Sequence, residues 1–310
     1  MKPLSAWRRI PSRALPRLFL CLLPLLTLCE PVHALSIQDD SGHEVRLERP
    51  AERVVSLYGA FTEWLAAMDR LDLLVSRTAN EHEPKRVAAL PAIGTHLRPN
   101  LERILALRPD LVLQMSGRDA AMEPVRFLRE HGIPTAVFSV HDFPGLFSAL
   151  KRVGTLCDAE LEAGNLVGSM KERLAEVASR IRERRRPSVF FEVRWPNLLG
   201  AGKHSMVDAV IRAAGGRNAL EQGKKLVRLG QEALLDLNPD VYVVQKGPMN
   251  PDPVPPAERP QFTVLGAVRS GKVLTVDERR FSRPGPRGVG AVEKLASFLH
   301  PDAFAGENAP

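Results

Sequence analysis

Cysteine is scarce in this sequence of 310 residues, which contains only Cys21, Cys29 and Cys157. Cys21 and Cys29 lie in an N-terminal segment that we expect to be removed, so Cys157 would be alone in the mature protein. A single cysteine excludes an internal disulfide and a cysteine-based metal cluster. The hydrophobic content of 44% still fits one or two globular domains with ordinary cores.

The sequence also lacks an apolar run long enough for an ordinary membrane-spanning helix. Its longest run, Leu18–Leu28, follows a basic segment and precedes Val32-His33-Ala34, where small residues stand at the positions that a signal peptidase reads. We therefore predict that residues 1–34 are a cleaved secretory signal and that the mature protein is periplasmic. A lipid-attachment motif has a small residue directly before its cysteine. Here the large residue Leu28 precedes Cys29, so we do not expect a lipoprotein.

Strong charge of one sign is absent from the mature chain. Residues 1–34 contain five basic residues and one acidic residue, so their removal lowers the formal net charge from +7 to +3. The basicity of the full chain therefore belongs mainly to the export signal. We do not expect nucleic acid as a partner.

Enzyme motifs are missing as well. The sequence contains no G-x-S-x-G, H-E-x-x-H or G-x-G-x-x-G motif. Gly202-Lys203-His204-Ser205 is not a phosphate-binding loop, because Asn197 replaces the first glycine and His204 separates the lysine from the serine. No histidines have the spacing of a zinc site. We predict no enzyme activity, no cofactor and no resident metal.

What the sequence does contain is a long helical pattern over residues 158–186. Its apolar residues recur every three or four positions and define one face, and Asp158 is the expected N-cap. These apolar residues are Val167, Met170, Leu174, Val177 and Ile181. We predict an N-terminal lobe over residues 35–156, a linker helix over residues 157–186 and a C-terminal lobe over residues 187–310.

Strands alternate with helices on both sides of this helix, which predicts an α/β fold with doubly wound parallel sheets. After a hairpin over residues 35–47, we expect strands at 53–57, 73–76, 111–114, 135–140, 188–193, 241–245 and 273–276. The expected helices are 63–68 with Thr62 as its cap, 101–107, 122–131, 206–214, 232–237 and 289–299.

The two lobes repeat one another. The segment from Glu102 to Asp110 aligns with the segment from Glu232 to Asp240 at an offset of 130 residues, with leucine and proline also in register. This offset is too long for a solenoid and is natural for duplicated lobes.

Ligands of open parallel sheets bind beyond the carboxyl ends of the strands, so the residues after each strand are the candidates. They include aromatic residues and arginines, which suit a large, flat or aromatic anion. The candidates from this argument are Tyr58, Glu81, His82, Ser116, Arg118, Arg194, Trp195 and Arg283.

Several motifs together resemble the class III periplasmic substrate-binding proteins of ATP-driven importers, which capture iron-siderophores, haem and cobalamin. The motifs span nearly all of the mature chain. They are Val54-Val55-Ser56-Leu57 with Thr62-Glu63, Asn100-Leu101-Glu102 with Arg108-Pro109-Asp110, Gly200-Ala201-Gly202-Lys203, Ala213 to Ala219, Glu232 with Asn238-Pro239-Asp240, and Arg283 to Arg287.

The resemblance implies two Rossmann-like lobes joined by a single long helix, a monomer, and an inner-membrane ABC permease as partner. It implies that Glu102 and Glu232 dock the permease and that Arg283 contacts the ligand. Cobalamin-binding relatives place tryptophans where this chain has His96 and Met115. This difference favours an iron chelate, a siderophore or haem, and adds His96 to the candidate site.

The sequence leaves three alternative functions open. The first is a cobalamin-binding protein of the same family. The second is an exported protein that holds a bare metal ion with Glu81, His82, His96 and His204. The third is an exported hydrolase that uses carboxylates such as Glu63 and Glu192.

Overall fold

The computed structural model describes residues 34–117 and 119–305. The predicted signal segment 1–34 lies almost entirely outside the described residues, and no described helix is long and apolar enough to cross a membrane. The predicted lobe boundaries stay a prediction, and we use them as labels for the N-terminal lobe and the C-terminal lobe.

The N-terminal lobe contains a parallel sheet in the order β3-β6-β7, and a separate antiparallel hairpin forms from β1 and β2. Before the long helix, the elements are β1 (Leu35–Gln38), β2 (Glu44–Leu47), β3 (Val54–Ser56), α1 (Gly59–Ala67), η1 (Leu71–Leu73), α2 (Lys85–Ala88), β4 (Gly94–Thr95), β5 (Arg98–Pro99), α3 (Leu101–Ala106), β6 (Leu111–Met115), α4 (Asp119–Glu130), β7 (Thr135–Phe138) and α5 (Phe143–Leu156).

The C-terminal lobe contains a mixed sheet in the order β11-β9-β8-β12-β13, with β10 also parallel to β8. Its elements are β8 (Ser188–Arg194), β9 (Leu199–Ala201), α7 (Met206–Ala213), β10 (Arg217–Asn218), β11 (Leu226–Arg228), α8 (Gln231–Leu237), β12 (Val241–Lys246), η2 (Pro256–Glu258), η3 (Pro260–Phe262), α9 (Gly266–Arg269), β13 (Val273–Asp277), α10 (Glu278–Phe281), α11 (Arg287–Leu299) and η4 (Pro301–Ala303). The antiparallel strands β9 and β11 were not predicted.

The long helix is present but shorter than predicted, because α6 spans Glu160–Arg180. Its 21 residues extend over about 31 Å. Asp158 is not the N-cap: its φ of 52° is left-handed, and Ala159 occupies the cap position without a side-chain hydrogen bond. At the other end, Ile181 is the C-cap, and Pro187 prevents the helical pattern from continuing into β8.

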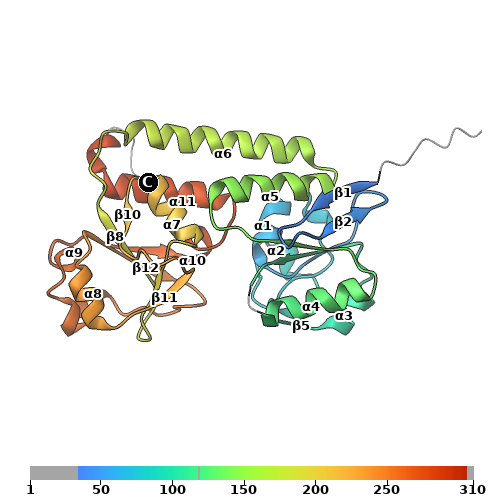
Figure 1. Cartoon of the computed structure of the whole chain (residues 1–310), viewed down its shortest axis with the longest axis horizontal. Helices are drawn as coiled ribbons and strands as arrows, with labels where there is room; N and C mark the ends of the chain where they lie inside the picture. Colours follow the sequence, from blue (N-terminus) through green and yellow to red (C-terminus); the bar gives the residue numbers. More distant parts are fainter. Residues whose placement is uncertain (1–33, 118, 306–310) are drawn as a thin grey trace, which may run out of the picture. The chain divides into compact units, whose positions relative to one another are not determined.

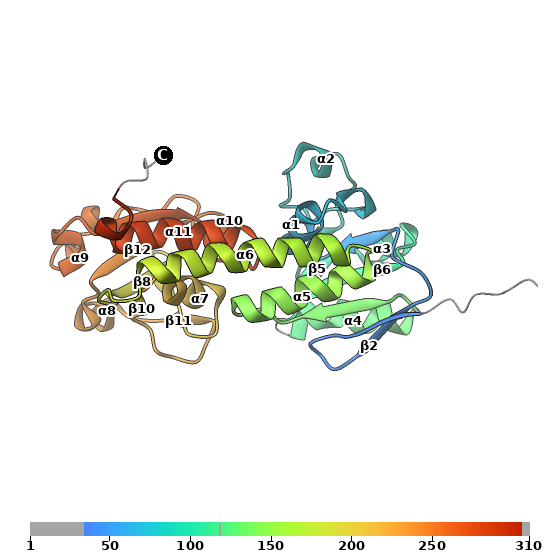
Figure 2. The same ribbon diagram turned by 90° about the horizontal axis from the view of Figure 1, so that it is seen from above.

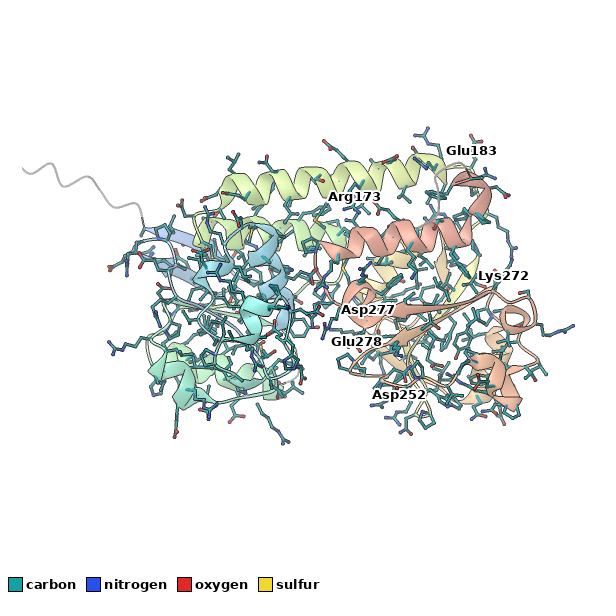
Figure 3. All side chains as sticks on the ribbon, turned by 180° about the vertical axis from the view of Figure 1, so that it is seen from behind. Arg173, Glu183, Asp252, Lys272, Asp277 and Glu278 are labelled. Carbon is teal, nitrogen blue, oxygen red and sulfur yellow. The ribbon has the colours of Figure 1, made fainter. Side chains whose placement is uncertain are left out.

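Helix α6 packs against α5 of the N-terminal lobe and α11 of the C-terminal lobe, as Figures 1 and 2 both show. Val167, Met170 and Val177 on its predicted apolar face are buried in the largest core cluster, which includes residues of both lobes. Arg173 of α6, labelled in Figure 3, points from that helix toward α11. It donates two hydrogen bonds, 2.8 and 2.7 Å long, to the carboxylate of Glu293 on α11. One helix therefore connects the lobes through packing and a bidentate ion pair.

Two local predictions in the N-terminal lobe are wrong. Helix α1 begins at Gly59 with Tyr58 as its N-cap, and Thr62 lies inside the helix, where its hydroxyl donates to Ser56 Oγ at 3.4 Å. The predicted strand 73–76 makes only a single bridge, between Leu74 and Val54, after the short helix η1.

The internal repeat is visible in the backbone as well as the sequence. Arg108 and Asn238 both have positive φ, 44° and 34°, directly before a Pro-Asp pair. The carboxylate of Asp110 accepts hydrogen bonds from the backbone N–H groups just before β3, and the carboxylate of Asp240 accepts hydrogen bonds from the N–H and hydroxyl of Ser188 at the start of β8. The repeated aspartate therefore anchors the first core strand of each lobe.

We expect Asp240→Ala to lower the free energy of unfolding by about 1–3 kcal/mol, because the Ser188 N–H loses its acceptor. Burial raises the pKa of Asp240, but hydrogen bonds from Ser188 and Arg185 outweigh it and hold the pKa below its usual value. The carboxylate therefore stabilises the fold above the unfolded pKa of about 3.9, and this stabilisation is lost as the pH falls through the lower folded pKa.

Chemical denaturation across this acidic range measures the effect. The control is Asp236→Ala, which removes an exposed aspartate of α8. Equal unfolding free energies for wild type and Asp240→Ala at neutral pH would show that the carboxylate does not anchor β8.

Candidate ligand-binding site

Tyr58 is the first candidate along the chain and lies two residues beyond the end of β3. Its half-buried ring packs edge-on against the ring of His96, with ring centroids 5.5 Å apart. The guanidinium carbon of Arg283 lies 6.0 Å from the centre of the Tyr58 ring. Burial raises the pKa of the Tyr58 phenol, and the positive charge of Arg283 acts in the opposite direction. An aromatic ring, an imidazole and a guanidinium therefore meet at the carboxyl end of β3.

Arg283 reaches this position from the C-terminal lobe. Its Nη1 donates to the carbonyl oxygen of Gly59 at 3.3 Å. A Cβ at residue 59 would lie 2.9 Å from Arg283 Nη1 and 2.9 Å from Glu81 Oε1, so only glycine permits this approach. The bond to Gly59 is the only hydrogen bond of Arg283 among the described residues, and its other N–H groups remain for a ligand.

The crossing segment, residues 278–287, carries Arg283 and is held on α1 by further contacts. Trp64 Nε1 donates to the carbonyl oxygen of Pro284 at 2.8 Å, and Trp64 is fully buried. Glu63 accepts from Arg287 Nη2 at 2.8 Å and from Arg287 N at 3.2 Å. These contacts fix the position of Arg283 relative to Tyr58.

A small cavity of about 20 Å³ lies beside the crossing segment. This volume holds about one water molecule and is far too small for a chelate. The predicted ligand residue His82 is exposed and lines this cavity. The lining residues are Asn80, Glu81, His82, Glu83, Arg279, Arg283 and Arg287.

His96 lies in the tight turn between β4 and β5, and its side chain is exposed. Its carbonyl oxygen accepts from Nε2 of the buried Gln114 at 3.4 Å, which ties the turn to β6. Burial lowers the pKa of His96, and the positive charge of Lys225 lowers it further. Lys225 belongs to the C-terminal lobe and was not predicted, because the strand β11 that follows it is only three residues long and was itself missed.

Arg194 ends β8, next to an irregularity in the pairing of β8 with β9. Its Nε is buried and has no hydrogen-bond partner among the described residues. A buried N–H without an acceptor is costly, so this side chain has a donor ready for a ligand. Arg118, the other predicted arginine, lies outside the described residues.

Trp195 is half-buried, and part of its ring already has a partner within the C-terminal lobe. The guanidinium carbon of Arg259 lies 4.3 Å from the centre of the indole, and the ring of Phe262 packs edge-on at 5.2 Å. The residue therefore supports its own lobe, and its contact with a ligand stays a prediction.

The two carboxylates of the hydrolase alternative are bound to different arginines. Buried Glu192 forms two hydrogen bonds with Arg259 and accepts a third, of 2.6 Å, from the Tyr242 hydroxyl. Glu63 pairs with Arg287, as described above. Neither carboxylate is paired with the other, which a hydrolase of this kind requires.

The bare-cation alternative requires several metal-binding side chains at one point. Among residues 34–117 and 119–305, no group of three or more His, Cys, Asp or Glu side chains could hold a metal ion. The alternative built on Glu81, His82, His96 and His204 therefore has no converging ligand set in the described part of the chain.

Glu102 and Glu232 occupy equivalent places, each as the second residue of its helix, α3 and α8. Both are exposed, and neither forms an ion pair with another described residue. Figure 1 shows α3 and α8 on the side away from α6. Two free carboxylates are thus presented, one by each lobe.

Comparison with known proteins gives a family match over residues 54–279, to the family described as periplasmic binding protein. An uncharacterized ABC transporter substrate-binding lipoprotein, YvrC of Bacillus subtilis (strain 168), is 30% identical over 88% of this chain and 88% of its own length. A vitamin B12-binding protein of Yersinia pestis (strain Pestoides F) is 25% identical over 80% of this chain and 86% of its own length.

Solved structures agree on the fold. The periplasmic heme-binding protein RhuT from Roseiflexus sp. RS-1, in its apo form, superimposes with a TM-score of 0.69. It covers 82% of this chain and 99% of its own, at 24% sequence identity. This likeness confirms the predicted α/β fold with two lobes.

We expect Gly59→Ala to weaken ligand binding without destabilising the protein. The added methyl group meets only the ends of the Arg283 and Glu81 side chains, which can move away, and alanine is favoured over glycine in a helix. Haemin titration measures affinity, and thermal unfolding measures stability. Gly164→Ala on α6, where nothing lies within 4 Å, is the control and should leave affinity unchanged. Unchanged affinity in Gly59→Ala would show that the position of Arg283 does not matter for binding.

Proposed function

This chain belongs to the periplasmic binding protein family as a substrate-binding protein of ABC transporters, and we propose that its substrate is an iron chelate, either a ferric siderophore or haem. Family membership confirms that the chain is a binding protein and not an enzyme. It also implies a membrane permease as partner and a small-molecule ligand. The identity of the ligand is our proposal.

The contact of Tyr58, His96 and Arg283 carries this proposal. A phenol oxygen and an imidazole nitrogen are donors that iron accepts, and a guanidinium binds carboxylate or phenolate oxygens at a chelate periphery.

Cobalamin is the second candidate, because a vitamin B12-binding protein is among the relatives. The tryptophans that the family resemblance assigns to cobalamin binders are replaced here by His96 and Met115. An imidazole and a thioether offer less flat apolar surface to a corrin than two indoles do. This difference supports the iron chelate over cobalamin.

We expect Arg283→Ala to weaken binding about ten- to a hundredfold, because it removes charge-assisted hydrogen bonds worth about 1.5–3 kcal/mol. Titrations of wild type and variant with haemin, a ferric siderophore and cyanocobalamin measure both the ligand class and the loss. Arg269→Ala removes an exposed arginine of α9 and is the matched control. Tight binding of cyanocobalamin alone would replace our proposal by the cobalamin alternative.

We propose that Glu102 and Glu232 dock the two subunits of the permease. Their exposure and equivalent positions in the repeat support this role, since a symmetric permease offers equivalent basic patches to both. Charges at the rim of a protein interface affect the rate of encounter and the orientation of the two partners more than their binding affinity.

The double variant Glu102→Ala, Glu232→Ala should keep ligand affinity and thermal stability while transport falls strongly. Ligand-stimulated ATPase activity of the reconstituted importer measures delivery. The control pair, Glu123→Ala with Glu172→Ala, removes two exposed glutamates from α4 and α6. Normal transport by the docking variant would mean that the two glutamates serve only their helix starts.

We further propose that the mature protein begins after residue 34, is not lipidated and is a monomer in the periplasm. The Bacillus subtilis relative is named a lipoprotein, which makes Cys29 the alternative point of attachment. Intact mass of the exported protein distinguishes cleavage after residue 34 from a lipidated Cys29.

A further inference from the structure

Three basic side chains from the two lobes gather near the candidate site without having been assigned to it. His141 follows β7 in the N-terminal lobe, and His204 follows β9 in the C-terminal lobe. Their rings meet edge-on with centroids 6.1 Å apart. Lys225, just before β11, acts by its charge on both His141 and His96. We name His141, His204 and Lys225 the basic cluster.

The fold explains why the two histidines meet. Each directly precedes the N-cap of a helix, Asp142 for α5 and Ser205 for α7. The first residues of these helices, Phe143 and Met206, both approach Gly288 of α11, where an added Cβ would lie 3.6 and 3.7 Å from their side chains. The first residues of two helices pack on one glycine, and this packing places one histidine of each lobe next to the other.

Backbone pairing sets the position of Lys225. Gly202 N donates to the carbonyl oxygen of Lys225 at 3.1 Å, and Lys203 N donates to the carbonyl oxygen of Gln222 at 3.0 Å. A Cβ at Gly202 would clash with the carbonyl oxygen of Lys224, so glycine is required for the two segments to come this close. His204 and Lys225 are consequently neighbours on adjacent turns.

Few negative charges neutralise the basic cluster. His141, His204 and Lys225 are exposed, and no described carboxylate forms an ion pair with them. Asp142 and Asp40 lie near His141, but Asp142 accepts from Gly145 N and Asp40 pairs with Arg152. The Ser139 hydroxyl, 3.0 Å from His141 Nε2, orients that ring.

Resting on the proposed function, we infer that the substrate is an iron chelate with carboxylate arms, one of which binds between His141, His204 and Lys225. His96 connects the two regions, because it contacts Tyr58 and lies within the field of Lys225. A ligand that lies on Tyr58 and His96 would thus place one edge toward Arg283 and another toward the basic cluster. Haem and carboxylate siderophores have this chemistry, whereas neutral hydroxamates do not.

The pKa directions in the basic cluster show how it would respond to an anionic occupant. Loss of water around the side chain lowers the pKa of Lys225, and the same effect together with the charge of Lys225 lowers the pKa of His141. A bound carboxylate would reverse both effects by favouring the charged forms.

Two matched probes test the carboxylate arm: haemin, and haemin dimethyl ester, which has the same ring and metal without free carboxylates. We expect the triple variant His141→Gln, His204→Gln, Lys225→Gln to bind haemin about ten- to a hundredfold more weakly and to bind the ester as the wild type does. Lys203→Gln is the control, since Lys203 lies on the same turn but faces Glu221 at 3.9 Å. Equal haemin affinity in wild type and triple variant would overturn the inference while leaving the proposed function intact.

A second measurement tests the carboxylate subsite without a bound chelate. Citrate, as a simple carboxylate probe, should raise the pKa of His141 and His204 in an NMR titration of the wild type, and the effect should weaken in Lys225→Gln. If citrate leaves both histidine signals unchanged, the carboxylate subsite is wrong. Absence of binding to haemin, ferric citrate and a ferric hydroxamate would instead refute the proposed function, and the histidine titration would still test the carboxylate subsite.

Discussion

The hydrogen bond from the Trp64 indole to the Pro284 carbonyl is the contact on which the ligand site depends. It is fully buried, so its loss would leave an indole N–H without a partner in the core. Because Pro284 and Pro286 restrict the backbone on either side of Gly285, the crossing segment has few alternative paths. The ion pair of Glu63 with Arg287 then holds the same segment from the other side. Arg283 stands over Tyr58 because its backbone has little freedom to lie elsewhere.

A second constraint belongs to the C-terminal lobe alone. Glu192, Arg259 and Tyr242 form a buried network in which the carboxylate, the guanidinium and the phenol satisfy one another. Burial and the charge of Glu192 raise the pKa of Tyr242 far above its ordinary value, so the phenol stays a donor. Arg259 also covers the ring of Trp195. A polar network inside the lobe thus holds the loop that follows β12 against the end of β8, next to Arg194 and Trp195.

Sequence reasoning could place candidate residues from the order of the strands. Tyr58, Arg194 and Trp195 were predicted because ligands of parallel sheets bind beyond the carboxyl ends of the strands, and their role in binding stays a prediction. The repeat of Asp110 in Asp240 pointed to two lobes. Sequence reasoning missed α5, although Asp142 before Phe143-Pro144 is a clear cap signal. It also missed the antiparallel strands β9 and β11, each only three residues long.

What sequence reasoning could not supply were contacts between residues far apart in the chain. No local pattern links Gly59 with Arg283, or His141 with His204, since both pairs arise from how the lobes pack on α6 and α11. The wrong N-cap prediction at Asp158 has a local origin instead, because the tight turn from α5 into α6 places Asp158 in a left-handed backbone conformation and Ala159 in the cap position.

Capture and delivery are separated by the polarity of the parallel strands. Residues that could hold a ligand stand after the carboxyl ends of β3 and β8, and the exposed glutamates stand on helices whose chain leads into the amino ends of β6 and β12. Since these strands run in parallel within each lobe, the proposed ligand residues and the proposed docking glutamates lie at opposite ends of the strands. The proposed ligand residues can therefore differ between related proteins while the proposed docking residues stay the same. The repeat places one of these glutamates in each lobe, which suits a permease with two equivalent subunits.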